Sequence, residues 1–158
     1  MILSGIGYDL HRLEAGRKLM LGGVEVPFFK GPVGHSDGDA LSHAICDALL
    51  GAAGLGDIGA HFPDTDPKWK DIPGPIFLEN VRKLLDQRGL RIRHIDAIVI
   101  CERPKLNPHF LAIRAALATA LRIAISEINL KAKTNEGVDA IGRGDAIAVH
   151  AIATVEQD

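Results

Sequence analysis

The chain has 158 residues, 47% of them hydrophobic, and its 18 Lys and Arg against 20 Asp and Glu leave a formal net charge of -2. A chain of this length and composition can bury a core and fold as one domain, which excludes a disordered protein. Because acidic and basic side chains are interspersed, the sequence lacks the basic stripe that a nucleic-acid partner or an anionic membrane surface requires.

The cysteines and the apolar stretches indicate the compartment. Cys46 and Cys101 lie far apart in apolar runs, as buried thiols of a reducing compartment do, and predict no disulfide. Met1 to Asp9 shows neither a signal peptide nor a transit peptide. The apolar-rich stretch Leu111 to Ile125 contains two arginines and is shorter than the ~20 residues of a membrane-spanning helix. We therefore expect a cytoplasmic protein without a membrane partner.

The first elements along the chain are predicted to be strands. Ile2 to Arg12 is rich in β-forming residues, and a short polar interval separates it from the apolar segment Leu19 to Val26. This arrangement predicts a β-hairpin between the two segments. Glycines and prolines over residues 27–38 predict a loop that leads into the next element.

A helix and a long loop follow. Apolar residues spaced at i, i+3 and i+4 predict an amphipathic helix from Ala40 to about Ala53, with Asp37 or Asp39 as its cap. The segment Gly56 to Gly74 is rich in Gly, Pro and Asp and predicts a loop. A loop of this length inside a small domain is more often functional or mobile than idle.

The second half of the chain alternates helices and strands. The spacing predicts a helix from Pro75 to Gly89, a strand from Ile92 to Cys101 buried on both faces, and a helix from Pro108 to about Ile123. Further strands are predicted over Ile128 to Lys133 and Ala146 to Val155. This order predicts an α/β (α+β) single domain with one mixed β-sheet and helices packed on one face, leaving the other face for more helices or another subunit.

The most informative local pattern is an aspartate and a histidine two residues apart on the first strand. Asp9 and His11 project from the same face, about 6–7 Å apart, so that a carboxylate and an imidazole can bind one cation. His43 on the following helix offers a third ligand. One Asp and two His suit zinc, and three protein ligands leave the open position of a catalytic site. The alternative is an ordinary surface pair.

Polar residues around His43 extend this candidate site. Asp39 and Asp47 each lie four residues from His43 and could accept its second ring proton, or serve only as a cap and a solvated acid. His35 and Ser36 lie in a glycine-rich turn before a helix N-terminus, where backbone N–H groups favour an anion. The alternative for that turn is a plain helix cap.

Two segments of the long loop, residues 57–59 and 62–66, carry three acids and a hydroxyl, which suit the hydroxyl groups of a polyol but would also suit a solvated turn. Their candidate residues are Asp57, Ile58, Gly59, Phe62, Pro63, Asp64, Thr65 and Asp66.

Two strand ends carry lysines that could hold a phosphate, although such lysines are ordinarily only solvated. The segments are Cys101, Glu102, Arg103, Pro104, Lys105, Leu106 and Asn107, and Lys133, Thr134, Asn135 and Glu136. Thr134 could donate to a phosphate oxygen, and Glu136 could hold Mg²⁺ through one carboxylate. Arg143, between two glycines, could pair with an anion or with an acid.

In chain order these motifs resemble the 2-C-methyl-D-erythritol 2,4-cyclodiphosphate synthase family of the non-mevalonate isoprenoid pathway, and the resemblance covers essentially the whole chain. The motifs that carry it are Asp9 to His11, Gly34 to Asp39 with His43, Gly56 to Gly59, Phe62 to Asp66, Pro104 with Lys105, and Lys133 to Glu136.

The resemblance implies a role for each motif. Asp9, His11 and His43 would bind one Zn²⁺ per subunit, and Glu136 a second ion, Mg²⁺ or Mn²⁺. His35 and Ser36 would contact phosphate, while His35 and Thr134 would steady the transition state. The loop residues 57–59 and 62–66 would hold the methylerythritol portion. Residues 101–107 would hold the cytidine diphosphate from a neighbouring subunit, and residues 133–136 would position phosphate.

The resemblance also implies an assembly and a reaction. The family forms homotrimers of a chorismate-mutase-like architecture with active sites at subunit junctions. Its enzymes are phosphorus–oxygen lyases that convert 4-diphosphocytidyl-2-C-methyl-D-erythritol 2-phosphate to the cyclic diphosphate and CMP. Arg143 matches a basic residue near the trimer axis, whereas Ala140 stands where some members carry an aromatic residue.

Two other readings of the same ligands stay open at the level of the residues. A zinc phosphohydrolase would activate water, but no residue is singled out as its general base. A non-enzymatic scaffold would use the metal structurally, although structural zinc usually takes four protein ligands and commonly cysteine.

Overall fold

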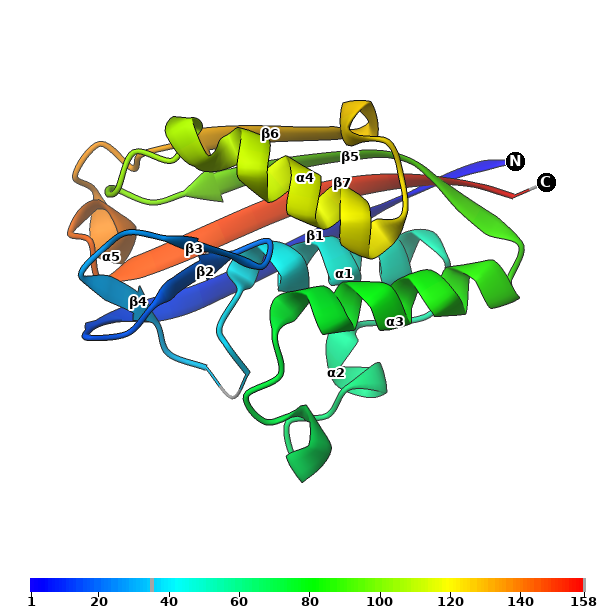
Figure 1. The fold of residues 1–158 in the computed structure, drawn as a ribbon, viewed down its shortest axis with the longest axis horizontal. Coiled ribbons are helices and arrows are strands. Elements are labelled where there is room, and N and C mark those ends of the chain that lie inside the picture. The colour runs from blue at the N-terminus through cyan, green and yellow to red at the C-terminus, as the bar shows by residue number, and fades with distance from the viewer. Residues whose placement is uncertain (35, 158) are drawn as a thin grey trace.

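The computed structural model describes residues 1–34 and 36–157, which form one mixed β-sheet with helices on one face (Figure 1). The sheet has five strands in the order β4-β1-β7-β5-β6. Only β5 and β6 run parallel, and the other neighbours are antiparallel. The strands are β1 (Ile2–Ala15), β4 (Lys30–Pro32), β5 (Leu90–Ile100), β6 (Ile128–Lys133) and β7 (Ala146–Gln157).

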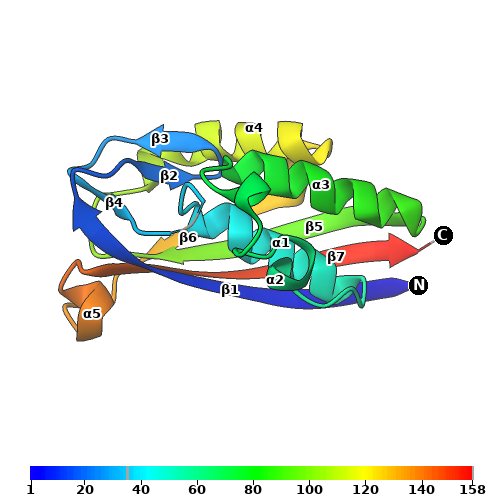
Figure 2. The ribbon, with the colours of Figure 1, turned by 90° about the horizontal axis from the view of Figure 1, so that it is seen from below.

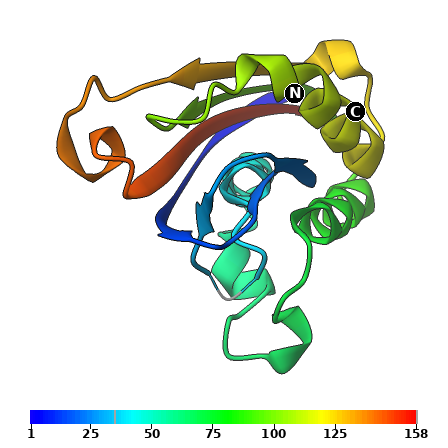
Figure 3. The ribbon, with the colours of Figure 1, turned by 60° about the vertical axis from the view of Figure 1, so that its left-hand side comes forward.

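Three long helices cover one face of this sheet, as the edge-on views show (Figures 2 and 3). They are α1 (Ala40–Ala52), α3 (Gly74–Gln87) and α4 (Phe110–Leu121). Short elements interrupt the connections: α2 (Ile58–His61), α5 (Asp139–Gly142) and the 3₁₀ turns Pro67–Trp69, Asn107–His109 and Ile125–Glu127. The predicted mixed sheet with helices on one face is confirmed, while α5 has too few residues to show a helical periodicity in the sequence.

The predicted hairpin between Ile2 to Arg12 and Leu19 to Val26 is wrong. β1 pairs with β4 and β7, whereas residues 19–26 form a small hairpin of their own, β2 (Leu19–Leu21) with β3 (Val24–Val26). Gly22 and Gly23 between these strands both have positive φ, as the commonest two-residue hairpin turn requires. The actual partner of β1 in this region is β4, which lies inside the segment predicted to be a loop.

The helix α1 lies unusually close to the sheet because β1 has no side chain at two contact points. A Cβ added at Gly5 would lie 2.2 Å from the carbonyl oxygen of Ala48, and one at Gly7 would lie 1.9 Å from that of Ala44. The residues that α1 turns toward the sheet are small and fully buried, so backbone packs against backbone. This contact fixes the distance between the two elements that carry the candidate metal ligands.

The opposite face of the sheet is left uncovered by the described chain. Ile6 is 71% exposed, Leu10 50% and Ile152 52%, although apolar strand residues normally lie inside. Ile98 and Ile100, predicted to be buried on both sides of their strand, are only half-buried for the same reason. An apolar sheet face of this kind is typical of a surface that another chain covers.

Within the described residues, no helix has the length and apolar character needed to cross a membrane. Both cysteines are free and buried, as predicted. Burial raises the pKa of Cys101 to about 11 and that of Cys46 well above its ordinary value.

Candidate metal and substrate site

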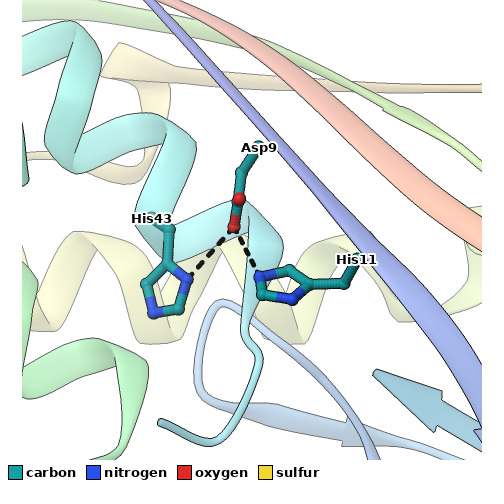
Figure 4. A group of neighbouring side chains, drawn as sticks. All are labelled: Asp9, His11 and His43. Carbon is teal, nitrogen blue, oxygen red and sulfur yellow. Dashed lines mark hydrogen bonds and ion pairs between the residues drawn. The ribbon is translucent and has the colours of Figure 1, made fainter. Parts of the chain in front are cut away.

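The predicted ligands Asp9, His11 and His43 converge in the structure (Figure 4). The strand β1 presents Asp9 and His11 on its helix-covered side, and α1 presents His43 from its first turn. Asp9 Oδ2 lies 2.8 Å from Nε2 of His11 and 3.1 Å from Nδ1 of His43. One ligand atom from each residue lies within 4.8 Å of the other two. One carboxylate and two imidazoles at this spacing fit a divalent ion such as zinc.

The three groups stabilise one another electrostatically. Burial raises the pKa of Asp9, but the hydrogen bonds and charges of His11 and His43 outweigh burial and lower its pKa overall. Burial lowers the pKa of His11, but the hydrogen bond and charge of Asp9, the hydrogen bond to Val33 and the charge of Asp39 together outweigh burial and raise its pKa overall. The carboxylate thus stays ionised and favours a cation between the rings.

The second nitrogen of each ring also has a partner. His11 Nδ1 lies 2.8 Å from the carbonyl oxygen of Val33, to which it donates, and this leaves Nε2 as the ligand atom. His43 Nε2 lies 3.1 Å from the hydroxyl of Ser36. Both rings are therefore held in orientation by the segment that precedes α1.

The prediction that Asp39 or Asp47 accepts the second ring proton of His43 is wrong. Asp39 is the cap of α1 and accepts from the backbone N–H of Ser42, as the alternative had it. Asp47 Oδ1 accepts from the backbone N–H of Ile58 at 2.7 Å and so ties α1 to α2. Four-residue spacing places these side chains near His43, but nearer donors engage them first.

A cavity of about 370 Å³ opens beside the ligands. The three candidate metal ligands line it together with an apolar wall built by Phe62, Trp69 and Phe77. The Phe77 ring meets the His43 ring edge-on, with centroids 5.5 Å apart, and Phe62 packs on both Trp69 and Phe77. Such a cavity can hold a ligand with a charged end and an apolar edge.

Several predicted substrate residues line this cavity, namely Ser36, Ile58, Gly59, Phe62, Pro63 and Asp64. Asp57 and Asp66 have local roles: Asp57 caps α2 through the N–H of Ala60, and Asp66 accepts from Lys68, which lowers its pKa. Thr65 is exposed beside them. His35 lies outside the residues that the structure describes.

Three cavity residues were not singled out as site residues from the sequence, namely Tyr8, Trp69 and Phe77. Phe77 carries only the signal of an apolar helix position. Trp69 is the single tryptophan of the chain and lies in the polar loop, which could have marked it as a candidate.

The other two predicted segments contact each other but not the three candidate metal ligands. The N–H of Asn135 donates to Glu102, and the N–H of Cys101 donates to the carbonyl of Lys133, because both segments follow the parallel strands β5 and β6. Thr134 donates to Glu136 at 2.9 Å. No residue of 101–107 or 133–136 lines the cavity beside the three candidate metal ligands.

Arg143 lies near a different cavity, which it lines with Leu10, Arg12, Ala140 and Asp145 at the edge of the uncovered sheet face. Its Nε lies 3.4 Å from Asp145, an exposed ion pair. The small side chain of Ala140 lies in the lining of the same cavity.

A mixed sheet covered on one face, with an Asp–His–His cluster opening into a half-apolar cavity, defines a small α/β protein with a site that could hold a metal ion beside a ligand. The chain belongs to the YgbB family, whose model matches residues 2–156. The family resemblance seen in the sequence is thereby confirmed.

Known proteins are similar to this one in sequence and in structure over nearly the whole chain. The 2-C-methyl-D-erythritol 2,4-cyclodiphosphate synthase of Gloeobacter violaceus is 54% identical over 153 residues, which cover 97% of this chain and 94% of that protein. A solved 2C-methyl-D-erythritol-2,4-cyclodiphosphate synthase in a CDP-bound form has a TM-score of 0.89 and 40% identity, covering 97% of this chain and 99% of that one. The bifunctional IspDF of Campylobacter jejuni has a TM-score of 0.91 and 37% identity, and this chain spans 43% of it.

Proposed function

We propose that this protein is a metal-dependent 2-C-methyl-D-erythritol 2,4-cyclodiphosphate synthase over residues 1–158. It converts 4-diphosphocytidyl-2-C-methyl-D-erythritol 2-phosphate to the 2,4-cyclodiphosphate and CMP in the non-mevalonate pathway. The observation that carries this proposal is the convergence of Asp9, His11 and His43 at a cavity, in a chain about half identical to proteins of that name.

The reaction is an intramolecular phosphoryl transfer that makes the protein a phosphorus–oxygen lyase. An oxygen of the 2-phosphate attacks the β-phosphorus of the diphosphate and forms a new P–O bond. The bond from that phosphorus to the bridging oxygen breaks, and CMP leaves with the oxygen and its electron pair. Because the substrate supplies its own nucleophile, catalysis depends mainly on folding the substrate back on itself and on stabilising charge.

Different residues of the chain are proposed to bind the phosphate, to exclude water and to stabilise charge. Ser36 and His35 are proposed to hold a phosphate next to the metal ligands. The apolar wall of Phe62, Trp69 and Phe77 excludes water, which would otherwise compete with the 2-phosphate. His35 and Thr134 are proposed to donate to the phosphoryl oxygens as negative charge develops on them.

The metal assignment rests on the chemistry of the donors. Asp9, His11 and His43 would hold Zn²⁺, and Glu136 would contribute to a site for Mg²⁺ or Mn²⁺ at the diphosphate. When bound, the ions supply positive charge that orients the phosphates and offsets their mutual repulsion. An aspartate with two histidines suits zinc, whereas a lone carboxylate suits magnesium beside substrate phosphates.

The active unit is proposed to be a homotrimer of chorismate-mutase-like architecture with its sites between subunits. Two observations support this. Residues 101–107 and 133–136, proposed to hold the cytidine diphosphate, lie apart from the cavity of their own chain and can complete that of a neighbour. The uncovered sheet face with Ile6, Leu10 and Ile152 supplies an apolar surface for that contact. Arg143 is proposed to lie near the trimer axis.

The partners and location follow from these assignments. The ligand is a small cytidine diphosphate, and neither nucleic acid nor membrane is proposed as a partner, in line with the interspersed charges of the chain. We propose that the enzyme acts in the cytoplasm.

The decisive experiment is to incubate the zinc-loaded protein with the cytidylyl substrate and to identify the products by phosphorus NMR. We expect CMP and a cyclic diphosphate in equal amounts. Inorganic phosphate in place of the cyclic product would instead identify a phosphohydrolase. The variant His43→Ala should lose both zinc and cyclisation, and full turnover by the metal-free variant would refute the proposed mechanism.

A further inference from the structure

The deepest polar feature of the described chain is a carboxylate that the reaction does not touch. Asp39 and Ser42 are the two polar side chains with no exposed surface among the described residues. We propose that Asp39 is a positioning residue for the metal ligand His43. This inference rests on the proposed metal site, and it deepens that site by naming what holds the third ligand in place.

Asp39 accepts four hydrogen bonds, two on each oxygen. Oδ1 accepts from the backbone N–H groups of Gly22 and Ser42 at 2.9 and 3.0 Å. Oδ2 accepts from the N–H of Gly23 at 2.7 Å and from the hydroxyl of Ser42 at 2.8 Å. A buried carboxylate tolerates the loss of water only when such donors replace it. Asp39 therefore joins the β2–β3 turn rigidly to the first turn of α1.

The backbone of His43 depends directly on this joint. The N–H of His43 donates to the carbonyl oxygen of Asp39 at 3.1 Å, so residues 39, 42 and 43 form one bonded turn. His43 is the first-turn residue that reaches Asp9 across the gap to β1. A small rotation of this turn would move Nδ1 of His43 away from the other two ligands.

The ring of His43 depends on the same joint through α3. A Cβ added at Gly74, the first residue of α3, would lie 2.6 Å from Asp39 Oδ2, so the start of α3 rests against this carboxylate. The N–H of Gly74 donates to the neighbouring Asp37 at 2.8 Å. One turn further along α3, Phe77 supports the His43 ring edge-on. The backbone of His43 and the helix that carries Phe77 against its ring thus meet at Asp39.

The chemistry of the four donors makes aspartate specific here. In Asp39→Asn the amide nitrogen replaces one oxygen, so one pair of donors faces another donor and loses its acceptor. In Asp39→Ser the shorter side chain can still cap α1 but does not extend to the β2–β3 turn. Asp39→Ser therefore tests attachment to the turn with the helix cap kept, whereas Asp39→Asn perturbs both, since each oxygen accepts one bond from the turn and one from Ser42.

The test measures zinc affinity by chelator competition for the full-length parent, Asp39→Asn and Asp39→Ser. Each variant is compared with a core variant of equal melting temperature, taken from Leu85→Val and Leu85→Ala. Leu85 is buried near the end of α3, far along that helix from Gly74. Turnover is then measured at increasing zinc, so that the zinc requirement is separated from kcat.

We expect both Asp39 variants to bind zinc at least about tenfold more weakly than the parent, while the Leu85 control binds as the parent does. The zinc concentration for half-maximal turnover should rise by the same factor. Equal zinc affinity in Asp39→Asn and its control would overturn the inference while leaving the proposed function intact. A parent that binds no zinc would overturn both.

Discussion

The glycine at position 7 provides a sharp test of how the fold builds the metal cluster. A methyl group placed there by Gly7→Ala would lie 1.9 Å from the carbonyl oxygen of Ala44 and 2.7 Å from the nitrogen of Ala48. Real Cβ atoms essentially never approach closer than 3.0 Å, and both contacts are backbone atoms that cannot rotate away. The helix α1 must therefore move from β1 by about 1 Å or more.

That displacement is large compared with what a metal site tolerates. His43 adjoins Ala44 on α1, whereas Asp9 and His11 follow Gly7 on β1, so the movement separates the ligands directly. Metal–ligand distances tolerate about 0.2 Å. We expect Gly7→Ala to lose about 1–3 kcal/mol of unfolding free energy through overpacking and to bind zinc at least about tenfold more weakly.

The assay combines urea unfolding of the metal-free protein with zinc titration, and Gly51→Ala is the matched control. A Cβ at Gly51, on the same helix, would make only ordinary contacts, 3.8 Å from the carbonyl oxygen of Ile6. Alanine also favours a helix over glycine by up to about 1 kcal/mol, so this variant should be at least as stable as the parent and should bind zinc equally. A Gly7→Ala protein with parental stability and zinc affinity would refute the argument that close packing sets the ligand geometry.

Three further outcomes follow from the structure. Zinc affinity should fall as pH decreases, and the fall should begin above pH 6.5. The raised pKa of His11 keeps its ring protonated at higher pH than usual, and only the neutral ring binds metal. A dissociation constant independent of pH would contradict this. Phe77→Ala should lower the unfolding free energy by about 3–5 kcal/mol and weaken zinc binding, since Phe77 is 3% exposed and supports the His43 ring; unchanged zinc titration would show that the ring needs no such support. With a pKa of about 11, Cys101 should be about one part in a thousand thiolate at pH 8, so an alkylating reagent should modify the folded protein far more slowly than free cysteine, and an equal rate would speak against this burial.

The sequence predicts best those elements in which buried residues recur at regular spacing. The helix α1 begins and ends within one residue of its prediction, and β6 matches at both ends, because buried faces repeat along them. The predicted pairing of β1 is wrong because its true partner, β4, has only three residues and contains Gly31 and Pro32, which are typical of a loop. Short strands are chosen by their neighbours in space rather than by their own residues.

The candidate site shows the same division. Asp9 and His11 share a face by strand alternation, so their pairing follows from the sequence. The sequence does not predict which residue contacts the second nitrogen of the His43 ring. Ser36 makes this contact from a turn whose path depends on Gly38 and on the buried Asp39. Residues 101–107 and 133–136 come together because parallel strands end at the same edge, a relation that the sequence could give only once the sheet order is known.

The pairing of β1 with β7 has a practical consequence for engineering. Met1 and Gln157 are hydrogen-bonded through their backbones, so both chain ends emerge side by side at one end of the sheet (Figure 1). Asp9 lies eight residues from Met1, about 26 Å further along the strand at the usual rise per residue. A peptide linker of a few glycines could join the ends into a circular permutant, and an affinity tag or fused reporter attached there would leave the catalytic cleft free.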